Sequence, residues 1–514
     1  MKRLAVLACL MLAACGNGSD PAPQETLRVD VVGGFDAAGS RTALDGPPAM
    51  MTEATQVGLV ALDGNGQVVP GIATSWRVSD DGLSYIFRLR PAKWADGREV
   101  RAGDIVAVYR RILEPGSRHP LKPLLDRIEN AADVSAGRKS PKALGVNDPL
   151  PNIVEIRLAA PQPAFLQLIA HSSMAIQRQG KVPPALGAFQ IEDAEARPLR
   201  LTRNPAYFDA SAVALGGIEL TPSDDVNAAI LRFRRNATDI VLSDGLAGLA
   251  EARSVPLQGA LRTEAAHASY GYLVNAKGPL ADRRVRRALA MAINRAAPPF
   301  VSAAFPGAPA LTGIVPLGLP SYPAPAQPDW AAWTPEARAA EAARLLAEAG
   351  YGAAKPLIVE VSIPKGPEHA ALLASVARDW AALGVTTRAL VRSPSGHASA
   401  LAKRDYQLAL VERVAPADSA RFFLVPFLCR AQPKLVCNRE ADRLLDASRR
   451  ETDLALRQAA VRQAEQLLID DVAMIPLLVP LRWSLVHPRV AGWSDNPLGA
   501  HPLSRLDVLP DTER

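Results

Sequence analysis

The cysteines are the side chains whose positions first suggest chemistry. Lys2 and Arg3 precede an apolar run that ends in LAAC, from Leu12 to Cys15. The run is too short to span a bilayer, so it predicts a secretory signal peptide over residues 1–14. Small residues before a cysteine have the shape of a lipobox, in which the thiol of Cys15 would accept a diacylglyceryl chain. The alternative is a plain cleaved signal with an incidental cysteine.

Residues 15–26 are rich in Gly, Ser, Pro and polar side chains, which predicts a flexible lipidated tether. No later stretch approaches eighteen consecutive apolar residues, the length expected of a membrane-spanning helix. We therefore expect a body in the periplasm or cell envelope that is held to the membrane by the lipid alone.

Two further cysteines, Cys429 and Cys437, bracket the sequence CRAQPKLVC. Outside the cytoplasm, two thiols this close are expected to form a disulfide. A metal site is the alternative, but no histidine or third cysteine lies nearby to complete a tetrahedral ligand set. The sequence therefore predicts a disulfide, no metal site and no cofactor.

Motifs of hydrolytic, metal-dependent and nucleotide-dependent enzymes are missing from the sequence. It contains no H-E-x-x-H, no G-x-S-x-G and no glycine-rich phosphate loop, and its seven histidines are scattered. The net charge of +6 comes with only 5% aromatic residues, whereas a nucleic-acid surface needs a basic face with interleaved aromatic side chains. We therefore expect neither an enzyme nor a nucleic-acid-binding protein.

The elements that must position any binding side chain alternate between strands and helices. Alternating apolar and polar residues predict strands, and apolar residues at helical spacing predict helices. Thr334 is expected to cap a helix, because a proline and an acid follow it. The expected strands are residues 27–32, 84–90, 152–158, 199–203, 217–221, 357–362 and 406–411. The expected helices are residues 103–113, 165–170, 282–294, 334–350, 369–383, 440–449 and 453–470.

A proline-rich stretch over residues 306–328 is expected to have little regular structure. The remaining chain, residues 27–514, is too long for one compact core. Its mixture of strands and helices predicts an α/β chain of two or three lobes.

Several short sequences occur in the order typical of one known family. They are GIATSW at 71–76, SDDG at 79–82, KWADG at 93–97, LGAF at 186–189, NPAYF at 204–208, DRRVRRALAMAIN at 282–294 and ARLLAEAGY at 343–351. Each is weak alone, but together they are specific, and they run from about residue 27 to residue 508. The chain resembles the family 5 extracytoplasmic solute-binding proteins, which include oligopeptide- and dipeptide-binding proteins. GW at 492–493 and DNPL at 495–498 are similar to the oligopeptide-binding subgroup.

The resemblance implies an α/β fold, a type II-like periplasmic-binding-protein clamshell of two lobes with an extra appended domain. Lobe I would be discontinuous and consist of residues 27–72, 188–264 and 485–514. Residues 73–187 would form the appended domain, and residues 265–484 would form lobe II. Two chain crossings near residues 265 and 485 would make the hinge.

The resemblance also implies a function. Family members hold an extended peptide between the lobes, pair a carboxylate with its amino terminus and meet its carboxyl end with basic groups. Closure buries the ligand and presents both lobes to an ABC permease and its ATPase. We therefore expect a monomeric peptide-binding lipoprotein of an importer. The alternatives are a clamshell that binds a non-peptide acidic solute, and a sensor rather than a transporter.

The sequence departs from the family pattern at the expected amine anchor. The family's loop reads G-W-x-A-D-Y, whereas this chain reads ERVAPAD over residues 412–418. Arg413 takes the place of the tryptophan, and Pro416 that of the aspartate. Asp418 or Glu412 could supply the carboxylate after a local shift, or both could be solvated loop acids. If neither reaches the cleft, the ligand is expected to lack a free amine, and Arg413 suggests an acidic group in it.

Three other side chains are candidate ligand contacts. His369 falls where the oligopeptide-binding subgroup places a histidine near the carboxyl end of the peptide, and the alternative is a surface histidine at a helix start. Tyr270 and Tyr272 lie on the strand that enters lobe II. Alternate strand residues point the same way, so both or neither should line the cleft. The alternative for this pair is a place in the core.

Overall fold

The computed structural model describes residues 25–33, 43–180, 182–243, 246, 248–257, 259–296, 307–431 and 434–510. Cys15, the predicted signal peptide and most of the predicted tether lie outside these ranges. None of the helices within them combines the length and apolar character that a membrane crossing requires.

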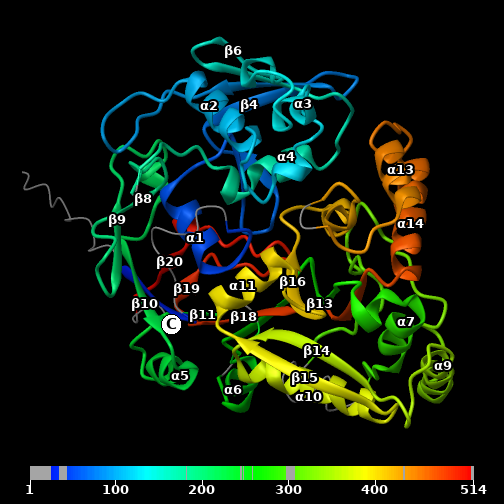
Figure 1. Cartoon of the computed structure of the whole chain (residues 1–514). Coiled ribbons are helices and arrows are strands. Elements are labelled where there is room, and N and C mark those ends of the chain that lie inside the picture. Colours follow the sequence, from blue (N-terminus) through cyan, green and yellow to red (C-terminus); the bar gives the residue numbers. More distant parts are fainter. Residues whose placement is uncertain are drawn as a thin grey trace, which may run out of the picture.

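One sheet gathers seven strands from the start, middle and end of the chain (Figure 1). In chain order they are β1 (Thr26–Val32), β8 (Phe189–Ile191), β9 (Leu199–Arg203), β10 (Gly217–Ser223), β11 (Ile240–Ser243), β12 (Leu261–Ala265) and β18 (Leu481–Val486). They lie side by side in the order β12-β18-β11-β1-β10-β9-β8. β1 is parallel to β10 and β11, and the other pairs are antiparallel. The central strand β1 buries Leu27, Val29 and Val31 in the core of this domain.

A second sheet has five strands in the order β15-β14-β16-β13-β17. Its strands are β13 (Ala268–Val274), β14 (Leu357–Pro364), β15 (Val385–Arg392), β16 (Leu408–Val414) and β17 (Met474–Leu478). β13 is antiparallel to β16 and β17, whereas β14 is parallel to β15 and β16. Helices α7 (Arg283–Ala292), α9 (Pro335–Glu348) and α10 (Pro367–Ala381) share a buried core with this sheet. α11 (Pro394–Lys403) connects β15 to β16.

A third sheet of four antiparallel strands forms a separate domain, drawn at the top of Figure 1. It contains β4 (Ala73–Val78), β5 (Ser84–Leu89), β6 (Val146–Leu150) and β7 (Ile153–Arg157), with α2 (Ala102–Leu113), α3 (Ala131–Ser135) and α4 (Phe165–Ala170). Phe87 and Ile105 of this domain belong to the same buried cluster as Phe423 and Leu468 of the second domain. The domain of the four-stranded sheet therefore packs against the domain of the five-stranded sheet.

The described chain contains further α-helices and strands. They are α1 (Gly46–Thr55), β2 (Val60–Leu62), β3 (Val68–Pro70), α5 (Val226–Arg234), α6 (Leu249–Ser254), α12 (Ala420–Leu424), α13 (Arg439–Ser448), α14 (Leu454–Asp470), β19 (Val490–Ala491) and β20 (Asp507–Val508).

The chain passes between the seven-stranded and the five-stranded sheets twice. It leaves β12 for β13 through residues 266–267 and returns from β17 to β18 through residues 479–480. The backbone N–H of Ala266 donates to the carbonyl oxygen of Pro480 at 3.3 Å, so the two crossings lie side by side. Two adjacent crossings between sheets are an arrangement in which a hinge can form. The lobe and appended-domain boundaries given by the sequence stay a prediction.

The expected elements are present wherever the sequence pattern was clear. The strand expected over residues 199–203 is β9, and the Thr334 side chain accepts a hydrogen bond from the backbone N–H of Ala337 at the start of α9. One expected boundary was wrong. The strand expected to end at residue 411 continues to Val414, because β13 pairs with it up to Ala268. Glu412 and Arg413, expected in a loop, are therefore strand residues.

The proline-rich stretch has few regular elements, as expected, but α14 fixes its backbone. Glu465 on α14 is fully buried. Its carboxylate accepts hydrogen bonds from the backbone N–H groups of Val315 and Ala326, both at 2.9 Å, and from the hydroxyl of Tyr322 at 2.8 Å. Buried backbone donors need acceptors, and here one side chain supplies them in place of a sheet or helix.

We expect the Glu465→Ala variant to be less stable by about 2–5 kcal/mol, because three buried donors lose their acceptor and a cavity remains. Urea unfolding measures the loss. Glu440→Ala, which removes an exposed glutamate from the neighbouring helix α13, is the matched control and should change the free energy of unfolding little. Equal losses for the two variants would contradict the role assigned to Glu465.

The stability of the wild-type protein should also depend on the protonation of Glu465. Burial raises the pKa of this carboxyl to about 7. Between the ordinary pKa of an unfolded glutamate, about 4.3, and pH 7, the folded state holds more protons than the unfolded state, so the free energy of unfolding falls as pH rises. Glu465→Gln cannot titrate and should lose this part of the slope, which unfolding measured from pH 4.5 to pH 8 would show. An unchanged slope would rule out Glu465 as its source.

Candidate functional site

A cavity of about 1250 Å³ lies between the domains of the four-stranded and the five-stranded sheets. Residues 120–138 line it from the first domain and residues 401–449 from the second, while Leu44 and Asp45 border it beside α1. We call it the main cavity. Its volume is above the range of roughly 300–1,000 Å³ that is usual for small-molecule sites, so it can hold a ligand larger than a typical small molecule.

Six basic and four acidic side chains stand among the largely apolar residues that line the main cavity. The carboxylate of Asp126 in the first domain lies 2.8 Å from the guanidinium of Arg421 and 3.6 Å from that of Arg449, both in the second domain. Arg430 pairs with Asp446 at 3.1 Å. The ion pairs of Asp126 therefore join the two domains beside the main cavity.

Arg413 on β16 also lines the main cavity. Its Nη2 donates to the backbone carbonyl of Phe422 at 2.9 Å, and its guanidinium lies 4.8 Å from the centre of the Phe422 ring. Burial lowers the pKa of Arg413 to about 10, so the guanidinium is still charged at neutral pH. The carbonyl and the ring hold the charged group in one orientation.

The pairing of β16 with β13 decides which side chains point into the main cavity. Arg413 lies opposite Ser269, and Glu412 lies opposite Tyr270. Paired residues share a face, and alternate strand residues share it too. Leu273 borders the main cavity, whereas Tyr270 belongs to the core beneath α10. Arg413 therefore points into the main cavity, and Glu412, which is exposed at its rim, lies on the other face of the strand.

Asp418 lies at a second, smaller cavity of about 500 Å³. One carboxylate oxygen accepts from the backbone N–H of Ser321 and the other from its hydroxyl, both at 2.7 Å. The backbone N–H of Asp418 donates to the side-chain oxygen of Gln167 at 2.7 Å. His267, at the first chain crossing, lines the same cavity. The carboxylate thus serves to position the proline-rich stretch beside the chain crossing.

Tyr270, Tyr272 and His369 lie together on the α10 side of the sheet. The hydroxyl of Tyr270 is 2.5 Å from Nδ1 of His369, and Nε2 of His369 is 3.3 Å from the carboxylate of Glu368. Burial lowers the pKa of His369 to about 4, so the ring is neutral at pH 7. Tyr272 is fully buried against Trp380. None of the three borders the main cavity or the smaller one, and their contact with a ligand stays a prediction.

The structure therefore separates the six candidate ligand contacts into three places. It brings Arg413 and Glu412 to the main cavity, on opposite faces of β16, and Asp418 to the smaller cavity. The sequence did not single out Asp126, Arg421 and Arg449, since the two ends of this ion-pair cluster are about 300 residues apart in the chain. Nothing in the sequence marks such a pairing, because arginines occur throughout it.

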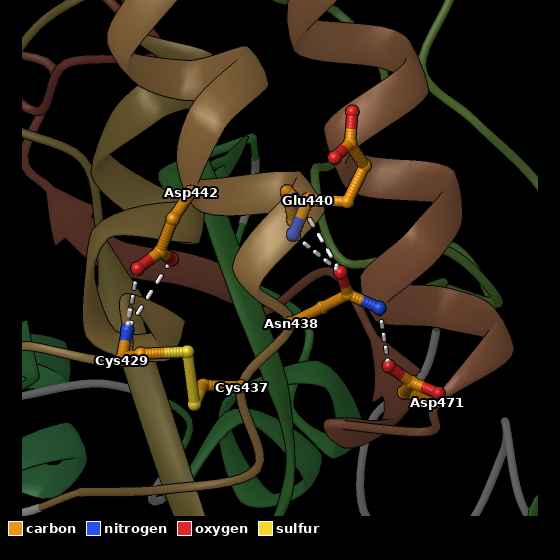
Figure 2. The surroundings of a disulfide bond; sticks show 7 residues. Cys429, Cys437, Asn438, Glu440, Asp442 and Asp471 are labelled. Atoms are coloured by element: carbon orange, nitrogen blue, oxygen red, sulfur yellow. Dashed lines mark hydrogen bonds between the residues drawn. A yellow bond between two sulfur atoms is a disulfide. The ribbon is translucent and has the colours of Figure 1, made fainter.

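Cys429 and Cys437 are joined by a disulfide whose Cα atoms are 5.1 Å apart (Figure 2). The backbone N–H of Cys429 donates to the carboxylate of Asp442 on α13, which connects the bridge to that helix. Asn438, directly after the bridge, caps α13 with its side-chain oxygen and donates from its amide nitrogen to Asp471. A bridge that closes so short a loop stabilises a fold by about 2–3 kcal/mol.

The disulfide shapes one wall of the main cavity. The lining residues beside or within the bridged segment are Leu428, Arg430, Ala431 and Leu435. Among the residues that the structure describes, no three His, Cys, Asp or Glu side chains gather as metal ligands. To a solute, the lining of the main cavity offers apolar surface and charged side chains.

Comparisons with known proteins agree on one family. The model of bacterial extracellular solute-binding proteins, family 5 (middle part), matches residues 67–433. The periplasmic oligopeptide-binding protein OppA of Salmonella typhimurium is 26% identical over 477 residues, which cover 88% of this chain and 86% of that protein. A probable deoxycholate-binding periplasmic protein of Escherichia coli, YgiS, is 28% identical over 85% of this chain and 84% of its own.

A solved structure shows the same fold. OppA of Haemophilus influenzae, in complex with the peptide RPPGFSPFR, superposes with a TM-score of 0.85 at 22% identity and covers 95% of this chain and 99% of its own.

The ion pairs between the two domains can be tested with matched aspartate variants. Asp126→Asn should lower the free energy of unfolding by about 1.5–3 kcal/mol, because Arg421 and Arg449 lose a carboxylate where their side chains are only 13% and 24% exposed. Asp133→Asn removes the exposed partner of Arg138 in the same domain and should have little effect. Calorimetric unfolding compares them, and an equal, small effect would contradict a structural role for Asp126.

Proposed function

Because the chain belongs to the bacterial extracellular solute-binding proteins of family 5, we propose that it captures oligopeptides between its lobes and delivers them to an ABC permease and its ATPase. The family assignment confirms the resemblance given by the sequence motifs, and the two-lobed α/β fold is confirmed with it. The proposal makes the protein a binding component rather than an enzyme.

The observation that carries the proposal is the main cavity, which lies beside β16 between the domains of the four-stranded and the five-stranded sheets, with Leu44 and Asp45 of the segment predicted as lobe I at its border. Strands β13 and β16 supply part of its wall, and its volume admits a short extended chain. Peptides bind such sites chiefly by main-chain hydrogen bonds, while roomy walls tolerate different side chains. The two lobes can close about the adjacent chain crossings, which serve as the hinge in this proposal. OppA of Salmonella typhimurium, named as an oligopeptide-binding protein, is similar over most of both chains.

The location and attachment of the protein complete this proposal. We propose that it is a monomer in the periplasm or cell envelope, anchored by a lipid on Cys15 through the tether of residues 15–26. The support is the lipobox-like LAAC sequence and the periplasmic location given in the names of similar proteins.

A second candidate function is the binding of an acidic solute that is not a peptide. Asp418, the candidate amine anchor, is engaged by Ser321 at the smaller cavity, whereas Arg413 points into the main cavity. A similar protein is named as probably binding deoxycholate, which is a carboxylate with an apolar body. Glu412, exposed at the rim, is the candidate carboxylate that lines the main cavity.

Thermal unfolding with tri- to pentapeptides, free and amino-blocked, tests the proposal. Peptides at a hundred times their dissociation constant should stabilise the protein by about 2.7 kcal/mol, because only the folded state binds them. Stabilisation by free peptides alone would indicate an amine anchor, whereas stabilisation by both kinds would retain peptides without one. If neither kind shifts the transition, oligopeptide capture is wrong.

A further inference from the structure

We propose that one edge of the seven-stranded sheet is a membrane-contact face, which docks on the anionic headgroups of the bilayer that holds the lipid anchor. This face consists of the amino-terminal end of β1, the segment just before β11, and the carboxyl-terminal ends of α5 and β18. We call it the basic edge. The inference goes beyond solute capture and rests on the proposed lipid anchor, because it adds a protein surface to a contact that the sequence assigned to the lipid alone.

The topology of the sheet brings these four segments together. The backbone N–H of Asp239, directly before β11, donates to the carbonyl oxygen of Arg28 on β1 at 2.9 Å. The backbone N–H of His487, directly after β18, donates to the carbonyl oxygen of Asp239, also at 2.9 Å. β10 and β11 are both parallel to β1, so α5 between them carries the chain back to the edge where β1 begins. The end of α5 therefore lies at the same edge.

The chain enters the fold at the basic edge. The first described residue, Glu25, lies three positions before Arg28, and Cys15 lies ten positions before Glu25. Ten residues reach at most about 35 Å even when fully extended. A lipid on Cys15 would therefore hold this edge within that reach of the bilayer, which raises the effective concentration of the edge at the membrane surface.

Two arginines and one carboxylate form the centre of the basic edge. Asp239 is fully buried, and both Arg28 and Arg489 pair with its carboxylate. One positive charge of this group is left over, and Glu25 lies near Arg28 and opposes it. The centre is thus close to neutral, so α5 sets the net charge of the edge.

The end of α5 supplies the surplus positive charge. Arg234 and Arg235 are exposed, and within the described ranges neither has a carboxylate at ion-pair distance. Leu231 lies one helical turn before them on the same face and is 42% exposed. An exposed leucine beside unpaired arginines suits a membrane interface, where the apolar side chain enters the headgroup layer and the cations meet phosphates.

A cavity of about 610 Å³ lies beside the end of α5. Arg234, His487 and Arg489 line it, together with apolar residues such as Leu257 and Leu509. Its volume is within the range usual for small-molecule sites, so it has room for the headgroup of one phospholipid. The arginines offer charge-assisted hydrogen bonds to the phosphate of that headgroup.

Flotation with vesicles tests the inference on the chain of residues 16–514, which contains every described element but lacks Cys15. One set of vesicles is phosphatidylcholine alone, and the other contains about 30% phosphatidylglycerol. The protein should bind the anionic vesicles at least about tenfold more tightly at about 50 mM NaCl. The difference should shrink at about 300 mM NaCl, because salt screens exposed charges.

Paired arginine variants locate the contact. Arg234→Gln combined with Arg235→Gln should weaken binding to the anionic vesicles by roughly tenfold to thirtyfold, since each arginine near an anionic surface contributes about fivefold. Arg77→Gln combined with Arg88→Gln is the matched control and should bind like the wild type. It removes two exposed arginines from the four-stranded sheet, in the domain drawn at the top of Figure 1.

The outcomes separate this inference from the proposed function. Equal binding to both kinds of vesicle, or equal losses for the two double variants, would overturn the membrane-contact face. Binding of inorganic phosphate without binding to vesicles would overturn it as well, because the cavity would then hold a free anion. The mass of the exported full-length protein tests the lipid anchor separately. Vesicle binding that depends on Arg234 and Arg235 supports the face even if Cys15 carries no lipid, and neither result bears on solute capture.

Discussion

The antiparallel pairing of β13 with β16 is the interaction on which the candidate site depends. It runs from Ala268 opposite Val414 to Val274 opposite Leu408. Because strand side chains alternate between faces, a slip of one residue in β16 would turn Arg413 toward the α10 core and Leu410 toward the main cavity. Such a slip would also exchange Ala409, buried on one face, with the larger Leu410, buried on the other, so the close packing of both faces opposes it.

The two domains that enclose the main cavity are held together by contacts of two kinds. A continuous buried cluster joins Phe87 and Ile105 to Phe423 and Leu468, and apolar burial of this kind supplies most of the stabilising free energy. The ion pairs of Asp126 with Arg421 and Arg449 fix how the two domains are oriented and add little net stability. The free energy gained by pairing is offset by the cost of removing each charge from water. Any opening of the main cavity must break both kinds of contact.

Near the chain crossings, side chains from distant segments supply the hydrogen-bond partners that strands or helices would otherwise give to the backbone. Glu465 satisfies backbone donors of the proline-rich stretch, and Ser321 within that stretch engages Asp418. Asp418 in turn contacts Gln167 of the domain with the four-stranded sheet. The result is a chain of hydrogen bonds from α14 to the smaller cavity. A proline-rich segment can thus be well ordered without forming strands or helices.

Local side-chain patterns were enough to predict the family, the α/β class and the elements with clear periodicity, such as β9 and the Thr334-capped helix α9. These depend on side-chain patterns within a few residues, which are visible along the chain. Three features could not be predicted in this way: Arg413 faces the main cavity, Tyr272 lies in the core, and Asp126 pairs with Arg421. Each of these depends on strand register or on the packing of domains, and both are set by contacts between segments far apart in sequence. Local propensity carries no record of such contacts.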